Sequence, residues 1–346
     1  MKNVTRYIVS LALFSMSFGY SETVAPTEYP SRAAIERELV DAEKSFNDAK
    51  QMFNAWYTGP ILSPSAHILP PGYINIQPYL FLTANYGTYT NSGSFEKTPT
   101  LLNINPQVPM IIGALKWMEI IINPQVDYNS LHHKSAFNFA DLSVGLGFGL
   151  INETPYVPAL LLSIQELFPT GKYQHLNPDK PVVTATGGGS FATTIGLNFS
   201  KLVWWWIPAH PMNFRLALSY TIPTMVEVEG FNAYGGGFGT NGRVHPGQSF
   251  SLDFGYEYSF TQNWAGALDI VYKYAVATHF SGDKGVDVLG GIASVGGPFN
   301  EQLSVAPAIE YNWNENLGFI GGVWLTVWGR NSAAFVSGVL SVAYTF

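Results

Sequence analysis

The sequence predicts an all-β fold, a transmembrane antiparallel β-barrel of about 12 strands, and three observations lead to this fold class. Only 12% of the 346 residues are charged, whereas ordinary soluble domains carry roughly 25%. Apolar side chains alternate with polar or small ones in successive segments of 72–346, which is the period of a strand whose two faces meet different solvents. No apolar run reaches the roughly 20 residues of a membrane-spanning helix. Together these features indicate strands with one face in lipid and the other in an enclosed lumen.

Composition and charge exclude several classes of function. The chain has no Cys, which excludes a thiolate nucleophile and a Cys-ligated metal. Its 17 Lys and Arg stand against 24 Asp and Glu, and nucleic-acid binding needs the opposite sign. Common catalytic motifs, such as a Gly-x-Ser-x-Gly elbow, a zincin helix or a P-loop, do not occur. We therefore expect no enzyme, no catalytic residues, no metal and no cofactor. A hydrolase at the outer rim that uses His279 with Asp283 or His245 remains a remote alternative.

Residues 1–21 have the features of an export signal. Lys2 and Arg6 precede an apolar stretch over 8–18, and small residues end the segment. The apolar stretch is too short to anchor the chain in a bilayer. We expect export, with a final location in the outer membrane of a Gram-negative bacterium.

Residues 22–71 form a separate N-terminal region. From Ser31 to Asn54, apolar residues recur at spacings of four and three, which predicts an α-helix with a heptad seam. The seam consists of Ile35, Leu39, Ala42, Phe46, Ala49 and Phe53. Proline residues then predict an extended connector that ends at Pro71. Two interpretations stay open: a periplasmic helix that packs against the barrel mouth or forms a short oligomer, and a plug inside the lumen.

Strands follow from 72 to 346. The clearest cover 138–150, 213–222, 249–260 and 303–312. Short links alternate with longer ones, and in bacterial barrels the short turns are periplasmic and the long loops external. The predicted short links are 113–116, 151–155, 202–211, 261–264 and 313–316, and the longer ones are 90–100, 130–137, 169–189, 223–247 and 277–301. A final outer turn at 329–333 gives an even strand count with both ends in the periplasm.

The last strand ends on an aromatic residue, Phe346. Such a terminus is typical of outer-membrane barrels, and we expect it to be recognised by the barrel assembly machinery. The other partners that we expect are membrane lipid and lipopolysaccharide around the apolar face and a small-molecule solute inside. A homo-oligomer stays open.

Polar and aromatic side chains on inward-facing strand positions are the candidate site. The pore-lining candidates are Glu119, Asp127, Asp141, Arg215, Asp253, Glu257, Asp269, Lys273, Glu310, Trp324 and Trp328. Acidic residues outnumber basic ones among them, so a water-filled pore would weakly favour cations. The alternative is that these charges pair with one another and fill a narrow interior. Trp324 and Trp328 either line a solute path or pack against the N-terminal region.

A short repeat, Asn-Pro-Gln-Val, occurs at 105–108 and again at 123–126. The two copies flank the short link at 113–116, so they are expected on paired strands of one hairpin. Asn103, Asn105 and Gln107 would then face inward together with Asn123, Gln125 and Asp127. These side chains form either a polar pore lining or a polar layer that fills the lumen. Proline in a strand removes one ladder donor, so these strands are expected to be irregular.

From about residue 108 to the C-terminus the chain resembles a family of bacterial outer-membrane proteins named as transporters of the meta-pathway of phenol degradation. The matching stretches are Gly113–Ile120, Asp141–Gly147, Phe168–Gly171 and 249–264. The resemblance implies a porin-like barrel with a transport role, but it does not carry over binding residues. We expect a channel for passive uptake of small, hydrophobic or aromatic solutes. The alternative is a structural or surface-interaction protein that acts through its long external loops.

Overall fold

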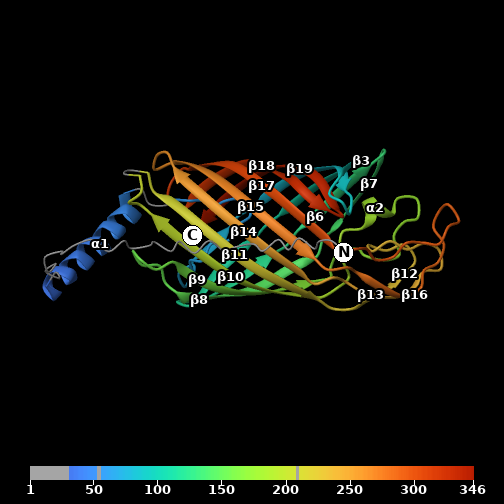
Figure 1. The fold of residues 1–346 in the computed structure, drawn as a ribbon, viewed down its shortest axis with the longest axis horizontal. Helices are drawn as coiled ribbons and strands as arrows, with labels where there is room; N and C mark the ends of the chain where they lie inside the picture. Colours follow the sequence, from blue (N-terminus) through green and yellow to red (C-terminus); the bar gives the residue numbers. More distant parts are fainter. Residues whose placement is uncertain (1–30, 53–55, 208–209) are drawn as a thin grey trace, which may run out of the picture. The chain divides into compact units, whose positions relative to one another are not determined.

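The computed structural model describes residues 31–52, 56–207 and 210–346 (Figure 1). The export signal predicted for 1–21 lies outside these residues. The chain divides into two compact units, Met1–Asp41 and Ala42–Phe346, so the division falls within the N-terminal helix. Among the described residues, no helix combines the length and the hydropathy that crossing a bilayer requires.

The predicted N-terminal helix is confirmed as α1 (Arg32–Met52). Ser31 caps its first turn, because its hydroxyl accepts a hydrogen bond from the Ala34 N–H at 3.3 Å. Ile35 and Leu39 of the heptad seam are both exposed.

The rest of the described chain is almost entirely β-structure, which confirms the predicted fold class. The barrel strands are β1 (Ile74–Ile76), β2 (Tyr79–Tyr89), β3 (Phe95–Gln107), β4 (Met110–Leu115), β5 (Met118–Asn123), β6 (Val126–Leu131), β7 (Lys134–Phe139), β8 (Leu142–Ile151), β9 (Ala159–Phe168), β10 (Ala192–Val203), β11 (Met212–Pro223), β14 (Ser249–Ser259), β15 (Trp264–Ala275), β17 (Asn300–Asn312), β18 (Leu317–Arg330) and β19 (Ser332–Thr345). Neighbouring strands are antiparallel, and β19 pairs with β18 on one side and with β1 and β2 on the other. The sheet is therefore closed.

Strands β1 to β8 form four passes along the barrel wall, because each of these passes is interrupted once and so counts as two strands. The interruptions lie at 77–78, 108–109, 124–125 and 140–141. Three of them contain a proline, which has no N–H to donate to the ladder. Bonds such as Val108 N–H to the Pro124 carbonyl cross the interrupted region. With eight continuous strands, the barrel has the twelve passes that the sequence predicts, and the irregularity expected at the Asn-Pro-Gln-Val repeat is found.

Two of the predicted long loops are wrong. Instead of loops over 90–100 and 130–137, β2–β3 and β6–β7 are long hairpins. The turn between β6 and β7 contains only His132 and His133, at φ 47° and 64°. Positive φ at both central residues is the geometry of a type I′ turn, which matches the twist of paired strands. The polar composition of 130–137 concealed this hairpin.

A small second sheet lies beyond one end of the barrel strands (Figure 1). It consists of β12 (Val226–Glu229), β13 (Asn241–His245) and β16 (His279–Asp283). Val226, Val228 and Val244 form its small buried core. The short helix α2 (Pro181–Thr184) belongs to the 169–191 connection at the same end. The long connections thus gather at one end of the barrel.

The two faces of the wall differ as the alternation predicts. On β18, Phe319, Val323 and Val327 are exposed, while Ile320 and Thr326 are buried. Trp205 and Trp206, in the turn between β10 and β11, are likewise exposed, as expected of an interfacial aromatic belt. An outer surface of exposed apolar side chains suits a hydrocarbon environment.

Candidate functional site: the barrel interior

Four acidic residues on the described barrel strands are less than 5% exposed. Glu119 of β5 is 4% exposed, and Glu257 of β14, Asp269 of β15 and Glu310 of β17 are 0% exposed. A buried carboxylate costs several kcal/mol unless charges and hydrogen bonds compensate for lost hydration. The partners of these four groups therefore determine what the interior contains.

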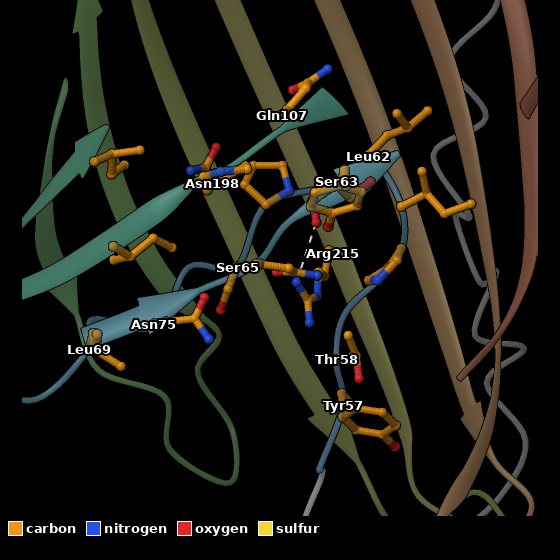
Figure 2. Close-up of a pocket in the computed structure, with 18 of the residues that line it drawn as sticks. Tyr57, Thr58, Leu62, Ser63, Ser65, Leu69, Asn75, Gln107, Asn198 and Arg215 are labelled. Carbon is orange, nitrogen blue, oxygen red and sulfur yellow. Dashed lines mark hydrogen bonds between the residues drawn. The ribbon is translucent and has the colours of Figure 1, made fainter. Parts of the chain in front are cut away.

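Most of these partners come from residues 57–70, which we call the luminal segment (Figure 2). Glu310 Oε2 accepts the backbone N–H groups of Thr58 and Gly59 at 2.9 and 3.4 Å. The two carboxylate oxygens of Asp269 accept the N–H groups of Leu62 and Ser63 at 3.1 and 3.0 Å.

Two further wall side chains hold the second half of the luminal segment. Glu119 accepts the Leu69 N–H at 3.0 Å, and the Ser200 hydroxyl accepts the Ala66 N–H at 2.9 Å. The segment therefore crosses the interior between β17 and β5. At these six N–H groups it is held by side chains of the wall rather than by a strand ladder.

The sequence of the luminal segment explains this arrangement. Pro60, Pro64 and Pro70 have no N–H, so the segment cannot form a regular ladder with a wall strand. Gly59 adopts φ +98°, a conformation that non-glycine residues rarely adopt. A Cβ at Gly59 would also lie 2.9 Å from Arg215 Nη1. Because the extended segment has few backbone N–H groups, a small number of acceptor side chains on the wall is enough to bind them.

Arg215 of β11 joins the wall to the luminal segment. Its Nε donates to Glu257 Oε2 at 3.0 Å. Its Nη1 donates to the Ser63 carbonyl at 3.3 Å, as Figure 2 shows. Asn213 donates a second hydrogen bond to the same Glu257 oxygen at 2.6 Å. The guanidinium thus compensates the buried Glu257 carboxylate and fixes the middle of the segment.

A second cluster holds the segment where it passes the turn between β8 and β9. His67 Nε2 lies 2.8 Å from Glu153 Oε2, and Lys201 Nζ lies 3.1 Å from Glu153 Oε1. Burial alone raises the pKa of the Glu153 carboxyl, but the hydrogen bonds from His67 and the Leu202 N–H, together with the neighbouring positive charges, lower it below the ordinary 4.5. Glu153 is therefore an ionised anchor for His67 at neutral pH.

Apolar contacts complete the fit of the luminal segment. Ile61 is 5% exposed and packs in one cluster with Phe81 and Ile320 of the wall. Leu62, Tyr79 and Trp324 pack against this cluster. The segment thus contacts apolar side chains of the wall as well as its carboxylates.

The interior nevertheless retains space. A cavity of about 740 Å³ lies between the luminal segment and the wall, with Leu62, Tyr79, Trp324 and Arg215 among its lining residues (Figure 2). A second cavity of about 590 Å³ is lined by polar side chains and by loop residues 185–188. Asn103 and Asn105 line both cavities, so the two spaces adjoin at these residues.

Asp141 anchors the loop that borders the second cavity. Its two carboxylate oxygens accept the N–H groups of Gly171 and Gly188, each at 2.8 Å. The Tyr234 hydroxyl donates to the Gly188 carbonyl at 2.6 Å. Burial, followed by the nearby Asp141 charge, raises the pKa of Tyr234 to about 12, so the phenol is neutral and donates to Gly188. Loop 169–191 is thereby held from two sides.

The predicted pore-lining residues differ in their surroundings. Those that touch the luminal segment or line the larger cavity are Glu119, Arg215, Asp269, Glu310 and Trp324. Glu257 is paired with Arg215 and Asn213. Asp127 and Asp141 line the second cavity. Asp253 bonds to the Ser251 hydroxyl at 2.6 Å, and Lys273 lies 5.7 Å from the Trp324 ring centroid. Trp328 is 40% exposed and lies 6.0 Å from Arg330, and it is not among the residues that line either cavity.

The residues of the luminal segment are the part of the site that sequence reasoning missed. The prolines of 55–71 predict only a connector, and the heptad seam makes the helix the plug candidate. A usable signal was present: 57–70 has Ile61, Leu62 and Ile68 but no Lys, Arg, Asp or Glu. A segment of this composition can donate its backbone N–H groups to carboxylates of the wall without bringing charges of its own.

The residues of the catalytic alternative, His279 with Asp283 or His245, do not form a compact site. His245 and His279 are register partners in the outer sheet, but Asp283 lies at the far end of β16, opposite Asn241. Within the described ranges, no three His, Asp or Glu side chains come together as a metal site.

Comparisons with known proteins show the fold. No family model and no curated protein matches the chain. An outer membrane channel from Pseudomonas putida F1 is similar in structure, with a TM-score of 0.62 and 12% identity, over 82% of this chain and 100% of the other. The translocator domain of the autotransporter NalP from Neisseria meningitidis has a TM-score of 0.43 and 11% identity, over 90% and 98% of the two chains. A mutant of the monoaromatic hydrocarbon channel TodX has a TM-score of 0.36 and 12% identity, over 84% and 94%. The first of these three likenesses, together with the closed sheet, shows an outer-membrane β-barrel fold.

Proposed function

We propose that this chain forms a channel for passive uptake of small hydrophobic or aromatic solutes across the bacterial outer membrane, and that residues 57–70 keep it closed. A twelve-strand barrel is wider than a filled eight-strand barrel and narrower than the 16–18 strands of open porins. Its interior would therefore take one small solute at a time.

One observation carries the proposal. The cavity of about 740 Å³ is bounded by the wall on one side and by the luminal segment on the other, and this segment belongs to no strand of the barrel. Displacing the segment would enlarge the cavity without breaking a wall ladder. Pockets that bind small solutes typically have volumes of about 300–1,000 Å³ and mostly apolar linings.

Planar-bilayer recordings test the proposal directly. The intact protein and a variant lacking residues 22–71 are refolded in detergent, and their heat-modifiable mobility on gels shows that each barrel has formed. We expect rare, small openings from the intact chain and a several-fold larger, persistent conductance from the shortened one. A folded barrel that conducts in neither form would overturn the proposal.

A second candidate function, surface interaction through the outer loops, is favoured by one observation. Leu289 and Ile292, in the connection that follows β16, are 92% and 81% exposed. Replacing 286–292 with a short Gly-Ser linker would abolish surface binding by intact cells and leave solute uptake unchanged if this candidate holds. Loss of uptake without loss of binding would exclude it.

A further inference from the structure

Four aromatic rings form a continuous stripe on the inner face of β2, β18 and β19. The rings of Tyr79 and Phe81 are stacked at 5.6 Å, the Phe81 and Trp324 rings are 6.3 Å apart, and Trp324 meets Phe335 edge-on at 4.7 Å. We call Tyr79, Phe81, Trp324 and Phe335 the aromatic stripe. Ring centroids 4.5–7 Å apart are the separations at which aromatic side chains attract one another.

A row of side-chain amides begins beside the β2 part of the aromatic stripe. The register of β2 and β3 pairs Tyr79 with Gln107 and Phe81 with Asn105. The Gln107 amide donates to Asn105 Oδ1 at 2.6 Å. The row, which we call the amide stripe, consists of Asn103, Asn105, Gln107, Asn123, Gln125 and Asn129. Each amide group offers two donors and two acceptor lone pairs, and the internal bonds use only part of this capacity.

The amide stripe joins the two cavities, and the aromatic stripe borders the larger one. Tyr79, Phe81 and Trp324 line the larger cavity together with Asn103 and Asn105. The same two asparagines line the second cavity. A solute in the larger cavity would contact both stripes, and the amide stripe would lead it to the second cavity.

The luminal segment already places an apolar group on the aromatic stripe. Ile61 is buried in one cluster with Phe81, and Leu62, Tyr79 and Trp324 pack against this cluster. The rings therefore have an affinity for an apolar surface presented from the lumen.

We infer that the two stripes form a binding site for an uncharged ring with an apolar face and hydrogen-bonding groups at its edge, and that this ring displaces Ile61 and Leu62 from the aromatic stripe. The inference rests on the proposed channel function. The rings take the flat apolar face, and the amides exchange donors and acceptors with the edge. Sugars and hydroxylated aromatics share this chemistry.

The charges near the stripes disfavour an anion. Asp127 is the carboxylate within the amide stripe, where it accepts the Asn103 amide at 2.8 Å. Two cations lie near the stripes: Lys273 lies over the Trp324 ring beside the Asp253 charge, and Arg215, which lines the larger cavity, is paired with Glu257. An anionic solute would therefore lose hydration without gaining a dedicated counter-charge.

Solute-dependent current through the full chain tests the inference. The probes are resorcinol, methyl β-glucoside and the anion benzenesulfonate, each added to a planar bilayer. Asn105→Leu removes one amide of the stripe, and Phe81→Leu keeps an apolar contact for Ile61 but removes the ring face. Asn198→Leu is the matched control, because Asn198 is buried and lines the same cavity but lies on β10, outside the stripe.

We expect resorcinol, methyl β-glucoside or both to change the current saturably, and benzenesulfonate to have no such effect. A response to one probe alone assigns the site to that source of ring. Asn105→Leu and Phe81→Leu should each raise the half-saturating concentration about fivefold, and Asn198→Leu should leave it within twofold.

Three results would overturn the inference: no response to either neutral probe, an equal response to benzenesulfonate, or an equal shift in Asn198→Leu. A failure of the channel proposal would give a different result in the same recordings. It would appear as no current, without solute, from either the intact chain or the variant lacking 22–71.

Discussion

The wall of the barrel and the luminal segment are held in place by different kinds of bonds. Along β10 and β11 the pairing is unbroken from Ala192–Pro223 to Val203–Met212, so backbone groups of one strand satisfy those of the next. In 57–70 the backbone N–H groups are accepted by side chains, among them Glu310 and Asp269. A point substitution cannot remove a ladder, but it can remove a side-chain acceptor. In our proposal, the segment is therefore released while the wall stays intact.

Removing two acceptors should give the largest effect on closure. Glu310→Leu with Asp269→Leu leaves four backbone N–H groups of the segment without acceptors, at about 1–3 kcal/mol each. We expect the open fraction in single-channel recordings to rise at least about a hundredfold. The control is Glu310→Gln with Asp269→Asn, which removes the charges but keeps an acceptor oxygen at each position. Equal behaviour of the two double variants would show that backbone capture is not what holds the segment.

A charge on the lipid face should destabilise the barrel without changing its conductance, since it acts on the wall alone. Val323→Arg on the exposed face of β18 should lower the free energy of unfolding by about 2–4 kcal/mol in a bilayer. Urea unfolding in lipid vesicles measures this loss, with Val323→Leu as the neutral control. Conductance of the folded fraction should match that of the unsubstituted chain. A large rise in conductance would mean that the wall and the closure are not separable.

Steric displacement of the segment should have a smaller effect. A Cβ at Gly113 of β4 would collide with the Pro70 carbonyl oxygen, whereas a Cβ at Gly338 of β19 meets no atom within 4 Å. We expect Gly113→Ala to raise the open fraction about tenfold, since a misplaced contact of about 1.4 kcal/mol changes an equilibrium by that factor. Gly338→Ala should leave it unchanged. Equal open fractions in the two variants would show that the Pro70 carbonyl does not pack against the wall at Gly113.

Loss of the Glu153 charge in acid should weakly loosen the end of the segment that Glu153 holds. Because the pKa of Glu153 is lowered in the folded state, its pairs with His67 and Lys201 stabilise the structure above the ordinary value of 4.5 and are lost as pH falls through the lowered pKa. We expect conductance to rise about fivefold over that acidic range. Glu153→Gln should conduct at neutral pH as the unsubstituted chain does in acid, with a flatter pH response. A pH profile identical in both proteins would contradict this role of Glu153.

Much of the wall could be predicted from the sequence, because alternation reports directly on the two faces of a strand. The inward placement of Glu257 and the outward placement of Val323 both follow from it. The hairpin at His132-His133 was missed since its positive φ angles leave no mark on hydropathy. The route of 57–70 could not be predicted, because its bonds use backbone N–H groups that every non-proline residue has. The carboxylates that bind the segment were predicted as pore-lining residues, but their binding to the segment was not predicted.

A reversible crosslink tests most directly whether the luminal segment is a movable closure. The chain has no Cys, so Ile68→Cys with Gly149→Cys introduces a single thiol pair. A Cβ on Gly149 would lie 3.8 Å from Cβ of Ile68, which is the mean separation across a disulfide. The account predicts that single-channel openings disappear when the variant is oxidised and return when it is reduced, with no change in barrel folding. Equal conductance in the oxidised and reduced states would contradict it, because solutes and ions would then pass without movement of the segment.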